Sequence, residues 1–187
     1  MQDVQSKART DQSNCWPAPG YMVVADSDGA RIALYGNDPL VDLAQATRLT
    51  ALLFGRLTYR DELASRCGVK VGASDAELVL AAYRKDGAAA LERLEGDFAV
   101  VVIDTEAGRV EAARDPMGGY PVYWKETRGG VALASSIRLL PGAEEFAPDA
   151  AFMSETLSLA IGEIDYFPGT AFRGVSRLAA VQRLTIT

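Results

Sequence analysis

Few side chains in this sequence could act as a nucleophile, a general base or a metal ligand. The 187 residues contain no histidine, which removes the commonest general base and the commonest metal ligand, so no metal site is predicted. There are two cysteines: Cys15 is followed by Trp16 and Pro17, and Cys67 stands in a short apolar segment that also contains glycine. We expect Cys15 to be a thiol on a polar tail and Cys67 to be a small buried residue.

Two charged motifs are the remaining candidates for chemistry. Asp75 lies in Ser74-Asp75-Ala76-Glu77, a sequence typical of the capping box that opens a helix. An acidic residue in the first turn is stabilised by the helix dipole whether or not a ligand binds there. The second motif, Arg114-Asp115, comes directly before the turn-forming residues 116–119, so we expect these two side chains to make local contacts beside the turn.

A run of strands carries the second motif. Residues 96–104 form a β-branched stretch behind a glycine, which predicts a central strand buried on both faces. A glycine-containing loop leads to residues 109–115, and the two segments together predict a hairpin. Residues 120–124 follow the turn and are rich in aromatic and β-branched side chains, so we expect a third strand that completes a meander.

The other expected elements surround this meander. A hairpin of residues 21–25 and 31–35 is followed by a linking segment at 38–46, with a possible short helical turn, and by a strand at 48–54. The Ser74 cap opens a helix that Gly87 ends. A short helix at 88–94, a helix from Asp149 to about Ala160 and strand-like segments near Phe172 and at 180–186 complete the set.

Length, composition and charge define the kind of protein. We expect a polar leader at residues 1–19 and one domain at 20–187, with 49% hydrophobic and 24% charged residues. The net charge of -6 and the absence of a basic run argue against nucleic acid or an anionic membrane as a partner. Two cysteines, no signal peptide and no long apolar segment favour the cytoplasm.

Several motifs resemble the glutaminase-type domain of the asparagine synthetase family from about Leu52 onward. That family has a Gly-x-Phe-Ala strand, an Ala-Arg-Asp-x-x-Gly-x-x-Pro-Leu-Tyr segment and an Ala-Ser-Glu-Ile-Lys-Ala-Leu segment, in this order. The corresponding segments here are Gly96-Asp97-Phe98-Ala99, Ala113-Arg114-Asp115-Pro116-Met117-Gly118-Gly119-Tyr120-Pro121-Val122-Tyr123 and Ala134-Ser135-Ser136-Ile137-Arg138-Leu139-Leu140. The resemblance implies an α+β fold, a four-layer α/β/β/α sandwich of the N-terminal-nucleophile hydrolase type with mainly antiparallel sheets.

The resemblance also implies a glutaminase site, which this sequence does not keep. In the family an N-terminal cysteine attacks glutamine, and the Asn and Gly of an Asn-Gly-Glu motif hold the oxyanion. Here Phe54 stands at the Asn position and Arg56 at the Glu position, and only Gly55 is retained. Asp75 matches the family residue that binds the glutamine amine. We call Phe54, Gly55, Arg56 and Asp75 the vestigial pocket, and we expect no catalytic residue in this chain.

The leading interpretation is a non-catalytic domain of an ATP-dependent, amide-forming ligase similar to lasso peptide cyclases or β-lactam synthetases. By this resemblance ATP and Mg²⁺ belong to a synthetase domain, which is absent from this sequence and would be supplied in cis or by a second chain, together with any peptide or amino-acid substrate. No cofactor is expected in this domain. Two alternatives stay open: an active glutamine amidotransferase matured at Cys15, and a stand-alone module that binds a ligand or a protein.

We also expect a surface for the synthetase domain. The segments around 114–123 and 167–178 keep residues typical of the family, and they combine aromatic side chains with arginine, as the cores of interfaces do. Core packing is the alternative explanation for their retention. The predicted interface residues are Arg114, Asp115, Tyr120, Tyr123 and Arg173.

Overall fold

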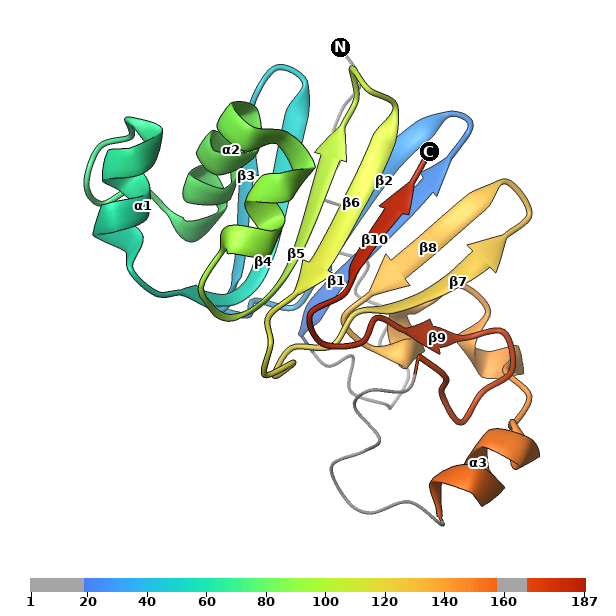
Figure 1. The fold of residues 1–187 in the computed structure, drawn as a ribbon. Helices are drawn as coiled ribbons and strands as arrows, with labels where there is room; N and C mark the ends of the chain where they lie inside the picture. Colours follow the sequence, from blue (N-terminus) through green and yellow to red (C-terminus); the bar gives the residue numbers. More distant parts are fainter. Residues whose placement is uncertain (1–18, 158–167) are drawn as a thin grey trace. The chain divides into compact units, whose positions relative to one another are not determined.

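The computed structural model describes residues 19–157 and 168–187, so the predicted leader lies almost entirely outside the described residues (Figure 1). The chain divides into two compact units, which are described one at a time. The first unit comprises Met1–Asp38 and Val122–Arg177, and the second comprises Pro39–Pro121 and Leu178–Thr187.

The second unit contains a five-stranded antiparallel sheet in the order β10-β6-β5-β4-β3. Its strands are β3 (Val41–Gln45), β4 (Leu49–Leu57), β5 (Gly96–Asp104), β6 (Arg109–Arg114) and β10 (Arg183–Ile186). The helices of the unit are α1 (Arg60–Cys67), α2 (Asp75–Asp86) and the 3₁₀ helix η1 (Gly87–Arg93). These three helices pack against one face of the sheet (Figure 1).

Strand β5 is the middle strand of this sheet, as predicted. The side chains of Phe98, Val100 and Val102 alternate with their neighbours and join the core under α2. The intervening Ala99, Val101 and Ile103 are no more than 5% exposed, so both faces of the strand are buried. This double burial explains why the segment is apolar throughout instead of alternating with polar residues.

Helix α2 begins with the predicted capping box. Ser74 Oγ accepts a hydrogen bond from Glu77 N at 3.3 Å, and Glu77 Oε2 accepts one from Ser74 N at 2.8 Å. Gly87 follows the last residue of the helix with φ +63°, a backbone conformation that favours glycine. The predicted second helix at 88–94 is present as η1.

The first unit contains the other five-stranded antiparallel sheet, in the order β2-β1-β8-β7-β9. Its strands are β1 (Gly20–Asp26), β2 (Gly29–Tyr35), β7 (Tyr123–Thr127), β8 (Gly130–Ala134) and β9 (Ser176–Arg177). The predicted first hairpin is confirmed as β1 and β2. Two short 3₁₀ helices, η2 (Ile137–Leu139) and η3 (Ala143–Glu145), precede α3 (Ala150–Thr156), which Asp149 caps as expected; the predicted end near Ala160 lies outside the described residues.

Two sequence-based predictions are wrong. The linking segment at 38–46 contains β3, an edge strand whose five residues pair with β4. The predicted meander is also interrupted: β7 begins at Tyr123, later than expected, and pairs with β8 and β9, while β10 takes the place beside β6. Local patterns predict that a strand forms but do not specify its partner, which is the physical reason for the second error.

The predicted α+β class with mainly antiparallel sheets is confirmed, and each sheet is antiparallel throughout. None of the helices in the described part of the chain is long and apolar enough to cross a bilayer.

Candidate functional site

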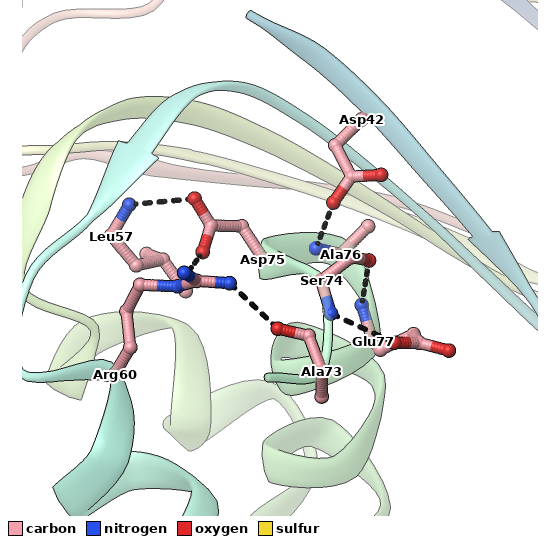
Figure 2. A network of polar contacts seen from close by, with 8 residues as sticks. All are labelled: Asp42, Leu57, Arg60, Ala73, Ser74, Asp75, Ala76 and Glu77. Atoms are coloured by element: carbon pink, nitrogen blue, oxygen red, sulfur yellow. Dashed lines mark hydrogen bonds and ion pairs between the residues drawn. The ribbon is translucent and has the colours of Figure 1, made fainter. Parts of the chain in front are cut away.

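Asp75, the residue that matches the family's amine-binding position, is held by its own domain. Its Oδ2 atom accepts a hydrogen bond from Leu57 N at 3.1 Å, and its Oδ1 atom lies 2.5 Å from Arg60 Nε (Figure 2). Arg60 also donates from Nη2 to the carbonyl of Ala73 at 2.6 Å. The Asp75 side chain is 13% exposed. A guanidinium of the same chain therefore occupies the cationic position beside this carboxylate.

The start of α2 is bound by further side chains of the second unit. Asp42 reaches from β3 and accepts a hydrogen bond from Ala76 N at 2.8 Å (Figure 2). Ser74 and Glu77 complete the capping box beside it. Carboxylates near a helix N-terminus are stabilised by the dipole and by the otherwise unpaired amides. The network thus explains the acidic residues around α2 without a ligand.

Gly55 keeps its family position, but its amide is already used. The N–H of Gly55 donates to Leu40 O at 2.8 Å, a bond that ties β4 to the residue just before β3. Gly55 has φ +122°, and a Cβ atom added there would lie 2.8 Å from Tyr120 Cε2 and 2.9 Å from Phe98 Cα. Close packing of β4 against β5 therefore requires glycine whether or not an oxyanion binds.

Phe54 does not replace the missing side-chain donor. The Phe54 ring contacts the ring of Tyr120 edge-on, with 4.6 Å between the centroids. This apolar contact fills the space beside Gly55, and a phenylalanine side chain has no hydrogen bond to donate. Arg56 is exposed and lies across from Asp97 in the pairing of β4 with β5.

The four residues of the vestigial pocket lie outside three cavities of the described structure. They occupy the end of β4 and the start of α2 within the second unit. Three pockets with volumes of about 430, 270 and 240 Å³ are lined entirely by described residues, and none of the three is lined by Phe54, Gly55, Arg56 or Asp75.

The predicted interface residues Arg114 and Asp115 are 5% and 1% exposed. Arg114 donates to the carbonyls of Gly118, Tyr120 (2.8 Å) and Leu178 (2.5 Å). Asp115 accepts from the amides of Phe98, Met117 and Gly118 at 2.7–3.1 Å. Both side chains therefore shape the loop after β6, in agreement with the expected local contacts. The burial of both side chains fits core packing, the alternative explanation for their retention.

The remaining predicted interface residues fall into different units. Tyr120 is half-buried in the second unit, where it packs on Phe54. Tyr123 lies in β7 and Arg173 is exposed, and both belong to the first unit. Of the cysteines, Cys67 is partly buried and packs against the helix-covered core, whereas Cys15 lies outside the described residues.

Two residues that hold this site were missed in the sequence. Asp42 was hidden because its segment was interpreted as a linker instead of a strand. Arg60 is the first residue of α1, and its partner Asp75 is 15 residues away in sequence. A pairing of opposite charges between two helix starts was the signal that could have suggested it. Among residues 19–157 and 168–187 there is no group of three or more His, Cys, Asp or Glu side chains that could hold a metal ion.

Comparison with known proteins identifies the family. A family model described as a glutamine amidotransferase domain matches residues 31–187. Amidase chyE of Penicillium rubens is 35% identical over 111 residues, which cover 57% of this chain and 16% of that protein. A probable glutamine-hydrolysing asparagine synthetase of Schizosaccharomyces pombe is 33% identical over 90 residues, which cover 47% of this chain and 16% of the relative. The matched region thus spans about a sixth of the length of these curated relatives.

The chain is also similar to solved structures. The glutamine phosphoribosylpyrophosphate amidotransferase from B. subtilis has a TM-score of 0.45 and 14% identity, covering 64% of this chain and 36% of that one. A structure described as the allosteric regulatory enzyme of purine biosynthesis has a TM-score of 0.42 and 15% identity, with the same coverage. On the family match over most of its length, the chain belongs to the glutamine amidotransferase domain family and is related to asparagine synthetase.

Proposed function

We propose that this chain is a non-catalytic glutaminase-like domain that supports the synthetase domain of an ATP-dependent, amide-forming ligase. The observation that carries the proposal is the contact between Arg60 and Asp75, because it places an internal cation on the carboxylate that matches the family's amine-binding residue. The substrate position is therefore filled by the protein itself.

Glutamine would have to displace this internal cation. The guanidinium and the carboxylate belong to one folded domain, so their contact involves no loss of translational freedom, whereas a free amino acid pays that cost on binding. Arg60 is further anchored by its bond to Ala73 O. We therefore expect glutamine to bind weakly or not at all at Asp75.

In this proposal the oxyanion of the reaction would also lack hydrogen-bond donors. Its one retained donor, the amide of Gly55, is bonded to Leu40 O, and the side chain at the neighbouring position is the phenyl ring of Phe54. Loss of a single oxyanion donor typically slows an enzyme by about 10²- to 10³-fold. Both donors are lost here, so the tetrahedral intermediate of glutamine hydrolysis would have no hydrogen-bond partner at this position.

A ligase of the lasso peptide cyclase or β-lactam synthetase type fits a domain without glutaminase chemistry. In such a reaction ATP activates a carboxylate and an amine of the substrate itself attacks it, so no ammonia from glutamine is needed. ATP and Mg²⁺ would then bind to the synthetase domain, in cis or on a second chain, and this domain would need no cofactor of its own.

Coexpression with a candidate synthetase region tests the supporting role. Arg173 is exposed in the first unit, so we expect Arg173→Glu to reduce copurification of the two parts without lowering the melting temperature of this domain. Arg128→Glu is the matched control, because it makes the same charge change at another exposed arginine of that unit. Equal copurification of both variants and the native chain would contradict the predicted interface.

A second candidate function is glutamine amidotransfer with Cys15 as the mature nucleophile. It is favoured by the names of the relatives, which include an amidase and a glutamine-hydrolysing synthetase. Under this alternative the first 14 residues would be removed, and Cys15→Ala would abolish the activity.

A further inference from the structure

A pocket of about 430 Å³ lies at the end of the second unit's sheet that is remote from the vestigial pocket. It is lined by the start of β4, the end of β5, the start of β6 and the last turn of α2. Leu49 in its wall and Gly55 are six residues apart on β4, which corresponds to about 20 Å along an extended strand. The pocket is therefore a separate feature, and its volume suits a small ligand.

Arginine is concentrated in this pocket, although the protein as a whole carries a net charge of -6. Its wall includes Arg48, Arg84 and Arg109. The two acidic residues of the wall are already engaged: Glu106 pairs with Arg48, and Asp104 Oδ1 accepts hydrogen bonds from the amides of Glu106 (3.1 Å) and Ala107 (2.9 Å).

The other two arginines retain donors. Arg84 is exposed and makes no hydrogen bond or ion pair with any described residue through its side chain. Arg109 forms an ion pair with Glu111. The distance from its Nε atom to Glu111 Oε1 is 3.7 Å, which is too long for a hydrogen bond. Glu111 also lies 3.7 Å from Arg183 Nε and accepts from Thr185 Oγ1 at 2.7 Å, so its charge is shared.

Two polar atoms at the pocket wall lack partners within the described structure. The hydroxyl of Tyr83 and the Nε of Arg109 are both buried, and neither makes a hydrogen bond of normal geometry, although the two side chains are close enough to interact with each other. The Tyr83 side chain is only 4% exposed. Burial raises the pKa of Tyr83, and the adjacent Arg109 guanidinium partly offsets this rise, so the phenol keeps its proton and remains a donor. Buried donors without acceptors are rare, and a bound group with free lone pairs is one way to satisfy them.

We propose that this pocket binds a small ligand through an oxyanion, either a carboxylate or a phosphate, with Arg84 and Arg109 as the cationic partners and Tyr83 as a hydroxyl donor. Guanidinium groups match the geometry of both anions and bind them with charge-assisted hydrogen bonds. The oxyanion supplies the acceptors that Tyr83 and Arg109 lack. The site is independent of glutamine hydrolysis, because it shares no residue with the vestigial pocket.

Titration of the ¹⁵N-labelled full chain tests the site. Sodium phosphate and sodium acetate are added separately at constant ionic strength, and the arginine Nε–H resonances are followed by NMR. We expect the Arg109 resonance to move along a saturating curve. Arg84→Gln and Arg109→Gln should each weaken binding about tenfold, because each removes a charge-assisted bond. Arg128→Gln removes the same charge from an exposed position of the first unit and should leave the affinity unchanged.

The outcomes are distinguishable. Saturation by phosphate alone or by acetate alone supports the site and identifies the anion, and saturation by both, with mutual competition, supports the shared chemistry. Shifts that never saturate, or that weaken equally in Arg128→Gln, overturn the proposal and leave a solvent-filled pocket. If Arg109→Gln fails to fold, Arg84→Gln decides, since this exposed side chain makes no hydrogen bond or ion pair with a described residue.

Discussion

The partner of Asp75 determines what this carboxylate can do. Its Oδ1 atom forms an ion pair with Arg60 at 2.5 Å, and its Oδ2 atom accepts a hydrogen bond from the Leu57 amide at 3.1 Å. The same two contacts join the end of β4, the start of α1 and the start of α2. A residue that could have bound a substrate therefore stabilises the fold.

Substitution of Arg60 should show this structural role. Arg60→Ala leaves the largely buried Asp75 carboxylate without its cation, and we expect the free energy of unfolding to fall by about 1–2 kcal/mol, less than for a fully buried pair because the Arg60 side chain is 45% exposed. Urea denaturation measures the change. Arg66→Ala, an exposed arginine of the same helix, is the control and should have an effect within about 0.5 kcal/mol.

A double-mutant cycle separates the pair from other effects. If the contact exists, Arg60→Ala combined with Asp75→Asn should destabilise the domain by clearly less than the sum of the single substitutions. Strict additivity of the two changes would contradict the ion pair.

The raised pKa of Tyr83 leads to a prediction of how the free energy of unfolding changes at alkaline pH. Because burial raises the pKa of Tyr83 above its usual 10.0, the folded state holds the phenolic proton more tightly than the unfolded state does. The unfolded state then binds fewer protons above about pH 10, so stability should fall as the pH rises through that point toward the folded pKa. Tyr83→Phe should make this decline shallower in denaturant melts, whereas Tyr59→Phe, which alters a phenol in a 62% exposed side chain, should follow the native chain.

The sequence predicts the helices and strands whose signals lie within their own residues. It does not predict those that depend on pairing with a segment far away in the chain. Strand β5 was recognised because its apolar run is set by burial on both faces, and α2 because its capping box lies within four residues. The edge strand β3 was missed because its mixed residues depend on pairing with β4. The partners of β7 and β10 arise from long-range pairing, which no local pattern specifies.

In the candidate site, too, residue types could be interpreted from the sequence, whereas contacts between distant segments could not. The loss of the side-chain donor at Phe54 could be predicted from the residue type alone. The occupation of Asp75 by Arg60 and of the Gly55 amide by Leu40 O could not, because both depend on how β3, β4 and the two helix starts meet.

The central position of β5 leads to a prediction at this scale. Phe98 is 1% exposed and belongs to the core under α2, so Phe98→Ala should lower the free energy of unfolding by roughly 3–5 kcal/mol through lost burial and the resulting cavity. Asp97→Ala changes the exposed neighbour on the same strand and should stay within about 0.5 kcal/mol. A loss below about 1 kcal/mol for Phe98→Ala in urea denaturation would mean that β5 is not central.

The whole molecule keeps the fold features of its family, whereas residues of the family's glutaminase site are replaced. The family match covers residues 31–187, and the two antiparallel sheets are present. The residues that match the family's glutamine-binding and oxyanion positions, however, make bonds within the second unit. A scaffold retained in this way is explained by a supporting role beside a synthetase domain, as proposed above.

Release of glutamate and ammonia from glutamine is the measurement that tests this account most directly. The full chain, its Cys15→Ala variant and its Arg60→Ala variant are incubated with glutamine under identical conditions, and both products are quantified. We predict the same background rate for all three, because the retained oxyanion donor is bonded to Leu40 O and its partner position is Phe54. Product formation by the native chain that Cys15→Ala abolishes would contradict the non-catalytic role and establish the amidotransferase alternative.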